Sequence, residues 1–300
     1  MGILKYEGEK VHLFVPGVSF KKTKKGSIRE ASDIVDDLWQ IADLVEKNNY
    51  AAIVGDTYTT MTEKVLRSIV RKDTGVNKGK KTPRTNIVTR KGREIAHPSK
   101  QDYGILASVV KEWFDSIWPS IIAGSHLILC GHERMIIEKD DDDDIIDSFG
   151  GLGTAGQLLM RSLPGETNLM IRLILRKGKP RRPPRRILTV IGDKNWKAKD
   201  RLGVFPEDGI DITGSKKKDE TQAEFQERLL EDSFNLWSDW FEEARSRGIS
   251  GSIGLYGGPG TGKTTFLSGA IEALYQLEGK PTLFCDFDSV GAVSLAKSLF

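Results

Sequence analysis

The sequence predicts an α/β fold with a mainly parallel β-sheet that is covered by helices on both faces. Three short runs are almost wholly apolar: 50–56 (YAAIVGD), 126–131 (HLILCG) and 252–256 (SIGLY). Strands buried on both faces carry such continuous runs, whereas half-buried strands alternate apolar and polar residues. Segments with helical periodicity separate the runs, and this alternation is typical of parallel sheets, whose strands need crossover helices.

The first half of the chain is expected to contain a strand, a helix, a buried strand, a second helix, a polar loop, a third helix and another buried strand. In that order they are Val11–Val15, Ile28–Glu46, Tyr50–Asp56, Thr59–Arg71, Arg71–Lys100, Asp102–Ala123 and His126–Gly131. Apolar residues at helical spacing define the helices, and Pro119 predicts a bend in the third because proline removes a helical hydrogen bond.

In the second half, two strands joined by a basic, proline-rich turn precede one long amphipathic helix, and a strand–helix–strand unit follows it. In order these elements are Asn168–Leu175, Ile187–Ile191, 216–250, Ser252–Tyr256, Thr264–Tyr275 and Pro281–Asp286. Thr221 and Glu224 form a capping box at the start of the long helix. Its apolar face favours packing on the core; the alternative is a helix that binds a partner or drives oligomerisation.

The composition is that of an ordinary globular protein of one large or two small domains, with 300 residues, 38% of them hydrophobic and 29% charged. No apolar run approaches the roughly 18 residues of a membrane span, and the first ten residues lack the apolar stretch of a signal peptide. We therefore expect a cytoplasmic protein with no membrane partner. Cys130 and Cys285 lie in predicted buried strands, which favours core positions over a disulfide or a metal site.

A phosphate-binding motif lies between the strand and the helix of the last unit. Residues 257–264, GGPGTGKT, fit the pattern G-x-x-x-x-G-K-[ST]. In such a loop the glycines let backbone N–H groups turn toward the phosphates, the lysine contacts the β- and γ-phosphates, and the hydroxyl ligates Mg²⁺. The expected nucleotide-binding residues are Gly257, Gly258, Pro259, Gly260, Thr261, Gly262, Lys263, Thr264 and Thr265.

Read in the order 251–300 and then 1–215, the parts resemble a RecA-like ATPase, most closely the small phage RecA-like ATPases of single-strand annealing and recombination. The glycine-rich loop then comes first, followed by LFCDFD, YAAIVGD, LILCGHE and WKAKDRLG. The resemblance implies a RecA-like P-loop NTPase in circularly permuted order that uses ATP and Mg²⁺. Residues 1–215 and 251–300 would be the two parts of its core, with 216–250 as a linker helix. Alternatively, the chain joins halves of two ATPases and builds composite sites between subunits.

The resemblance also implies roles for two aspartates and for the loop lysine. Asp56 ends an apolar strand like the Walker B aspartate, so it would hold Mg²⁺ together with Thr264. Asp288, two residues after Asp286, would position the attacking water, although the family usually has the longer glutamate there. The alternatives are a strand-end cap for Asp56 and a surface carboxylate without a catalytic role for Asp288. Lys263 is the expected catalytic cation.

Three further residues would complete the catalytic set. His132 follows a central strand where RecA-like proteins carry a polar residue that senses the γ-phosphate. Lys199 and Arg201 lie in a segment that resembles K-x-R-x-G, whose basic residues reach the nucleotide of the neighbouring subunit. The resemblance therefore implies a head-to-tail homo-oligomer. A strand-end histidine held by local hydrogen bonds and a solvated basic loop are the alternatives.

A basic loop between 71 and 100 is the expected site for single-stranded DNA, because each neutralised phosphate contact releases counterions. The expected DNA-binding residues are Lys78, Lys80, Lys81, Arg84, Arg90, Lys91 and Arg93. A solvated loop is the alternative. Aromatic residues are nearly absent from it, so little base stacking or sequence preference is expected. The acidic run Asp140–Asp144 would repel a phosphate backbone, and it would either gate the channel or bind a basic partner.

Together these features predict an ATP-hydrolysing, Mg²⁺-dependent, RecA-like protein that acts on single-stranded DNA in recombination or annealing. One alternative is a nucleotide-dependent switch that hydrolyses ATP slowly and binds a protein. Another is a helicase-type motor, which is less favoured because no separate helicase or primase-binding domain is visible in the sequence.

Overall fold

A computed structural model describes residues 3–7, 9–16, 19–23, 26–30, 33–76, 86–90, 93–140, 142–176, 184–214 and 219–288. Its helices are α1 (Ile34–Lys47), α2 (Tyr58–Val76), α3 (Lys100–Ile122), α4 (Gln157–Glu166), α5 (Gln222–Ser246) and α6 (Lys263–Glu278). Its strands are β1 (Ile3–Glu7), β2 (Val11–Val15), β3 (Ser19–Thr23), β4 (Gly26–Glu30), β5 (Ala52–Asp56), β6 (Asn86–Arg90), β7 (Arg93–His97), β8 (His126–Lys139), β9 (Ile145–Leu152), β10 (Leu169–Arg176), β11 (Arg185–Thr189), β12 (Lys199–Asp200), β13 (Ile210–Asp211), β14 (Ser252–Gly257) and β15 (Thr282–Asp286).

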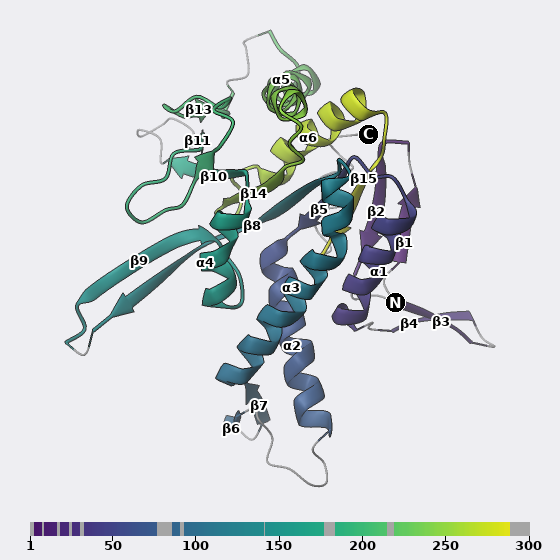
Figure 1. Cartoon of the computed structure of the whole chain (residues 1–300), viewed down its shortest axis with the longest axis vertical. Coiled ribbons are helices and arrows are strands. Elements are labelled where there is room, and N and C mark those ends of the chain that lie inside the picture. The colour runs from purple at the N-terminus through teal and green to yellow at the C-terminus, as the bar shows by residue number, and fades with distance from the viewer. Residues whose placement is uncertain are drawn as a thin grey trace.

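The main sheet confirms the predicted α/β class. Its order is β1-β2-β15-β5-β8-β14-β10-β11-β13, with β12 paired to β10 and β9 paired to β8. The pairs from β2 through β15, β5, β8 and β14 to β10 are all parallel. The outer pairs are antiparallel, so the sheet is mixed but mostly parallel at its centre. Strands β14 and β15 thus lie inside a sheet whose other strands all precede residue 215 (Figure 1).

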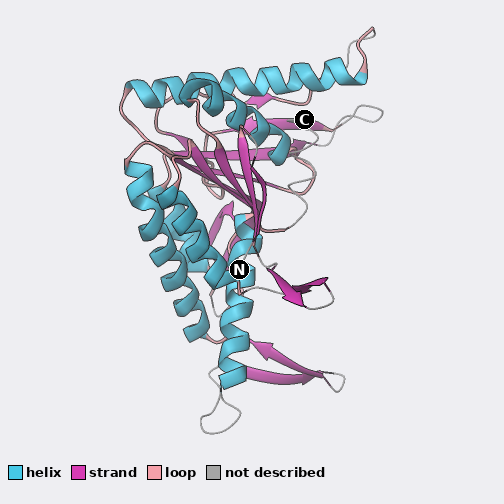
Figure 2. Ribbon diagram, turned by 90° about the vertical axis from the view of Figure 1, so that its right-hand side faces the viewer, coloured by secondary structure: helices cyan, strands magenta, loops and turns pink. Residues whose placement is uncertain are grey.

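Helices cover both faces of this sheet. Successive residues of a strand point to opposite faces, so Leu127 and Leu129 of β8 join one core cluster, while Ile128 and Cys130 join the other. The first cluster includes apolar residues of α1, α2 and α3, and the second includes those of α5 and α6. Figure 2 shows α5 running across one end of the molecule, while other helices extend from the sheet toward the opposite end.

Helix α5 packs on the core, as its apolar face favours. Its capping box, Thr221 with Glu224, is present. Trp237 is fully buried, and its indole N–H donates to the carbonyl of Phe266 on α6 at 3.0 Å. The two helices approach so closely that a Cβ on Gly269 would lie 2.3 Å from the Ser233 hydroxyl oxygen, which explains a glycine inside α6.

Three local expectations are wrong. The first helix begins only at Ile34, because Asp33 caps it by accepting a hydrogen bond from the Val35 amide, and β4 occupies part of the expected range. The predicted loop at 71–100 contains the end of α2 and the β6–β7 hairpin. The strand expected at 126–131 continues to Lys139 and pairs with β9 to form a long arm (Figure 1).

The described residues of the acidic run, Asp140 and Asp142–Asp144, lie in the turn of this β8–β9 arm, and Asp141 lies outside the described residues. The Asp140 side chain accepts hydrogen bonds from the amides of Asp142 and Asp144, at 3.0 and 2.9 Å. Asp143 adopts a left-handed conformation, φ 68°, which aspartate tolerates better than most residues. Across the described ranges, no helix is both long and apolar enough to cross a bilayer. Cys130 and Cys285 are buried and unbridged, as predicted.

Candidate functional site

The glycine-rich loop connects the end of β14 to the start of α6. Gly260 and Gly262 have φ angles of 72° and 92°, in the left-handed region that favours glycine. A Cβ on Gly257 would lie 2.3 Å from the carbonyl oxygen of Leu173 on β10, so only glycine fits there. The sequence motif therefore folds as a tight turn whose backbone leads directly into the N-terminus of a helix.

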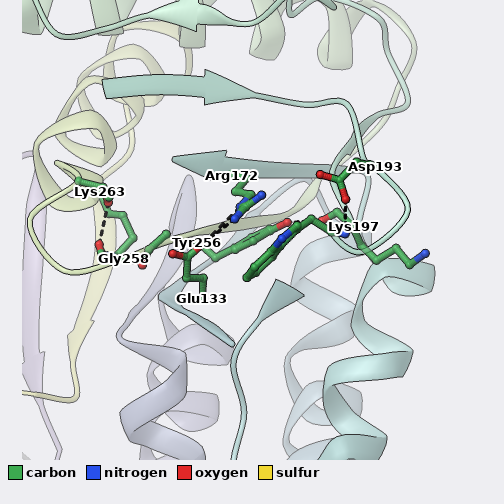
Figure 3. A network of polar contacts seen from close by, with 10 residues as sticks. Glu133, Arg172, Asp193, Lys197, Tyr256, Gly258 and Lys263 are labelled. Atoms are coloured by element: carbon green, nitrogen blue, oxygen red, sulfur yellow. Dashed lines mark hydrogen bonds and ion pairs between the residues drawn. The ribbon is translucent and has the colours of Figure 1, made fainter. Parts of the chain in front are cut away.

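Lys263 holds the loop together through its side chain. The ammonium donates to the carbonyls of Gly257 and Gly258, at 3.0 and 2.9 Å, and the residue is only 8% exposed (Figure 3). These carbonyls are neutral acceptors, and phosphate oxygens would make stronger, charge-assisted bonds to the same ammonium. Lys263 is thus a buried cation at the positive end of the α6 dipole.

Asp56 lies next to this loop within the same chain. The hydroxyl of Thr264 donates to Asp56 Oδ2 at 3.2 Å, and Asp56 is 2% exposed. Burial, followed by the negative charge of Asp288, raises the pKa of Asp56 to about 6, while hydrogen bonds from Cys130 and Thr264 lower it. A cation beside the carboxylate would offset that cost. A carboxylate and a hydroxyl are the hard oxygen ligands that Mg²⁺ prefers.

The remaining ligands of such an ion would come from phosphate and water. The structure contains no cluster of three or more His, Cys, Asp or Glu residues suited to a metal within its described ranges. Mg²⁺ in phosphate sites keeps several waters and uses one or two protein ligands. Thr264 and Asp56 therefore fit the ion that the sequence predicts.

Strand β15 brings a second acidic group to the loop. Asp286 pairs with Asp56 in register, and the amide of Phe287 donates to the Asp56 carbonyl at 2.6 Å. Asp288 interacts electrostatically with both Asp56 and His132. Lys64 of α2 donates to the Phe287 carbonyl and balances the aspartates: burial lowers its pKa, and their charges oppose that change.

His132 also lies at this edge of the sheet. It pairs in register with Gly257, the last residue of β14. Burial and the nearby Lys263 lower the pKa of His132, so its imidazole is neutral at pH 7. Its Nδ1 is buried and has no hydrogen-bond partner among the residues that the structure describes. The structure therefore brings together five residues predicted from the sequence, which are Lys263, Thr264, Asp56, Asp288 and His132.

Lys199 and Arg201 lie near the N-terminal ends of the parallel strands β10 and β14, whereas the glycine-rich loop follows the C-terminal end of β14. The side chain of Lys199 donates a hydrogen bond to the carbonyl of Pro164. The side chain of Arg201 donates to the carbonyl of Gly165 at 2.9 Å. Their strand pairs with the start of β10, next to Ile253 at the start of β14. Within one chain they are therefore separate from the glycine-rich loop.

The basic segment is described only in part. Lys78, Lys80, Lys81, Arg84 and Lys91 lie outside the described residues. The backbones of Arg90 and Arg93 pair with each other beside the turn of the β6–β7 hairpin. This hairpin lies at the far end of α2 and α3, away from the sheet (Figure 1). Helix α2 connects the two regions, since it starts two residues after Asp56 and its 19 residues span about 28 Å.

Two arginines near the loop belong to no recognisable sequence motif. Arg172 of β10 makes an ion pair with Glu133 of β8, and its guanidinium lies 3.6 Å above the Trp196 ring (Figure 3). Arg186 of β11 lies against Gly262. No local sequence pattern predicts either contact, because each arginine contacts residues that are distant from it in the sequence. Only the basic cluster around 176–186 pointed to this region.

Comparisons with protein-family models, with curated proteins and with solved structures give no match to this chain.

Proposed function

We propose that this chain is a Mg²⁺-dependent, RecA-like ATPase that acts on single-stranded DNA in recombination or annealing. The observation that carries the proposal is the hydrogen bond between Thr264 and Asp56. It joins the hydroxyl of the glycine-rich loop to a buried carboxylate 208 residues away in sequence. In P-loop NTPases a loop hydroxyl and a strand-end aspartate hold the Mg²⁺ of the bound nucleotide.

In this proposal the loop binds the phosphates of ATP. Backbone N–H groups of the loop and the N-terminus of α6 face the phosphates, where the helix dipole favours negative charge. Lys263 exchanges its two carbonyl partners for phosphate oxygens. Thr264 and Asp56 hold the Mg²⁺, which neutralises charge on the β- and γ-phosphate oxygens when bound.

Hydrolysis then needs a positioned water, and Asp288 supplies the carboxylate. The water attacks the γ-phosphorus in line with the bond to the departing ADP oxygen. One P–O bond forms as the other breaks, and the water proton passes to the Asp288 carboxylate. His132, neutral at pH 7, can donate one hydrogen bond to the γ-phosphate. This division of roles rests on positioning and charge, which carry most of the catalysis in phosphoryl transfer.

The permuted order and the head-to-tail assembly belong to the same proposal. Support for the permuted order comes from β14 and β15, which complete one sheet with strands from 1–215. Support for the assembly comes from Lys199 and Arg201, because residues that act on a neighbour's nucleotide must lie away from their own loop. In a head-to-tail ring or filament, the N-terminal ends of the parallel strands in one copy would then face the glycine-rich loop of the next copy.

DNA binding is proposed for the basic segment at the end of α2. Helix α2 runs from the nucleotide edge to the β6–β7 hairpin, where Arg90 and Arg93 face each other in the backbone register. Lys64, near the start of this helix, contacts the Phe287 carbonyl beside Asp288. A rigid helix anchored at the site offers a physical route by which nucleotide and DNA binding influence each other.

A protein-binding switch is the second candidate, and the β8–β9 arm favours it. Ile137, Ile145 and Ile146 on this arm are 50%, 62% and 65% exposed, next to an acidic turn. A largely apolar cavity of about 790 Å³ between α3 and α4 is bordered by the half-exposed Trp118. Exposed apolar residues rimmed by charge are typical of protein interfaces.

The decisive experiment measures ATP hydrolysis with and without single-stranded DNA, in Mg²⁺, for the wild type and for Lys263→Ala. The proposal predicts DNA-stimulated hydrolysis in the wild type and none above background in the variant. Hydrolysis at the wild-type rate in Lys263→Ala would refute the site. Hydrolysis that DNA does not stimulate would favour the protein-binding switch.

Neutralising Lys78, Lys80, Lys81 and Arg84 together tests the DNA site directly. DNA affinity should fall for all sequences, and the salt dependence should flatten by about 0.7 in slope for each lost phosphate contact. Neutralising the three lysines of 216–218 is the matched control, because they form a basic run outside the predicted DNA site. An unchanged slope in the four-residue variant would remove this segment from the DNA site.

A further inference from the structure

Arg186 lies against the glycine-rich loop, on the side away from Asp56. Its Cδ and Nε lie 3.6 and 3.8 Å from the position that a Cβ would take on Gly262. In the sheet, Arg186 pairs with Leu175 of β10, two residues beyond the Leu173 that pairs with Gly257. The arginine therefore stands at the same edge of the sheet as the loop, immediately before the first turn of α6.

The guanidinium of Arg186 makes no hydrogen bond or ion pair with the described residues, and its Nε is buried without a partner. Its neighbour Arg185, in contrast, pairs with Asp211 at 2.5 Å. A buried donor without an acceptor destabilises the folded state. The positive end of the α6 dipole adds to this cost, because it repels a second cation beside the first turn of the helix. An anion at this position would satisfy the donor and remove the repulsion.

The order of the strands gives a bound nucleotide its direction. Asp56 ends β5, two strands to one side of β14, and Arg186 lies on β11, two strands to the other side. Neighbouring strands are about 4.8 Å apart, so each residue is displaced by roughly 10 Å from the loop strand. If Thr264 and Asp56 hold the Mg²⁺ that accompanies the terminal phosphates, the γ-phosphate end of the nucleotide lies toward β5 and the nucleoside end toward β11.

We propose that Arg186 binds the α-phosphate of the nucleotide and is supplied by the same chain as the glycine-rich loop. The inference rests on the proposed nucleotide binding and assigns a residue that the phosphate-binding motif does not contain. The α-phosphate is common to ATP and ADP. Arg186 should therefore contribute to the binding of both nucleotides alike, unlike a residue that contacts the γ-phosphate.

The test compares Arg186→Gln with Arg185→Gln, its paired and exposed neighbour, by measuring the dissociation constants of ATP and ADP in Mg²⁺. We expect Arg186→Gln to weaken ATP and ADP by a similar factor of about ten, the loss of one charge-assisted contact. Arg185→Gln should change neither by more than about twofold. Arg186→Lys should recover part of the affinity, because it keeps the charge but loses the second donor of the fork.

A readout without nucleotide separates a ligand-binding role from a structural one. The midpoint of thermal unfolding of Arg186→Gln should equal or exceed that of the wild type, since the change removes an unpaired cation. A lower midpoint would assign Arg186 to the fold and overturn the inference. Unchanged affinities, or a loss for ATP but not for ADP, would also overturn it. A wild type that binds neither nucleotide would refute the proposed function, and the inference with it.

Discussion

Glu133 and Arg172 meet across the strand that leads into the glycine-rich loop. Glu133 lies on β8 and Arg172 on β10, the two neighbours of β14, and the guanidinium donates two hydrogen bonds to Glu133 Oε2, at 3.1 and 3.2 Å. The other carboxylate oxygen, Oε1, lies 3.5 Å from the position of a Cβ on Gly258. The pair therefore lies beside the start of the loop.

Glu133→Gln should lower the rate of ATP hydrolysis about tenfold while changing ATP affinity less, because it removes the charge of the ion pair that holds Arg172 beside the start of the loop. Steady-state kinetics and binding measurements test this. Glu138→Gln is the matched control, since Glu138 pairs with Arg161 farther along the same strand, where both side chains are exposed. Equal effects of the two substitutions would show that the Glu133 contact is not special to the loop.

Asp56→Asn should stabilise the protein at neutral pH in the absence of Mg²⁺. The native pKa of Asp56 is about 6, above its ordinary value of 3.8. The folded state therefore binds more protons than the unfolded state between pH 4 and 6, and stability falls as pH rises through that window. The full difference is about 3 kcal/mol. Urea unfolding at pH 7.5 should show the gain in Asp56→Asn, and at pH 3.5 the gain should vanish.

The same substitution should reduce turnover more than ATP binding, because it removes the charge that would hold the proposed Mg²⁺ and leaves Lys263 in place. The value of kcat/KM for Mg-ATP should fall as pH drops through about 6, because kcat/KM reports the free protein, in which the Asp56 carboxylate takes up a proton near that pH. A kcat/KM profile that is flat between pH 5 and 7 would contradict the proposed role of Asp56.

Arg201→Ala tests whether Arg201 acts on the nucleotide that is bound by a second copy of the chain. The variant should bind ATP like the wild type, since Arg201 contacts Gly165 and not its own loop, yet hydrolyse it poorly. Mixed with Lys263→Ala, it should regain activity, because one contact then joins an intact loop to an intact Arg201. Mixed oligomers that show no recovery would place the action of Arg201 within its own subunit or exclude it.

A re-ordered chain tests the permuted arrangement. A protein that runs from Asp219 to Phe300, continues through a linker into Met1 and ends at Gly214 should fold and bind ATP, because every described contact of the sheet is kept. A shorter version that starts at Ser250 should fail to fold. It loses the buried aromatic residues Trp237, Trp240 and Phe241 of α5. Their burial contributes roughly 5–9 kcal/mol, comparable with the whole stability of a domain.

If circular dichroism shows that neither re-ordered chain folds, the result would argue against the permuted single-domain arrangement. Folding of both would show that α5 is dispensable, contrary to its packing on α6.

The sequence predicted the centre of the molecule better than its edges, for physical reasons. Strands β5, β8 and β14 are buried on both faces, so their apolar runs are continuous and easy to read. The outer half of β8 and its partner β9 have mixed burial, and only their pairing defines them. Motif residues such as Lys263 were found because their spacing is local. Arg186 and Glu133 were not, since each touches the loop only through the fold.

The central position of β14 sets the order in which the protein can fold. Strands β8 and β10 are synthesised before residue 177, yet their shared neighbour, Ser252–Gly257, follows about 75 residues later. Until then each presents an unpaired edge toward the other, and such edges are prone to associate with foreign strands. The glycine-rich loop belongs to the segment that fills this gap. The proposed nucleotide site and the closure of the sheet should therefore form in a single late step of folding.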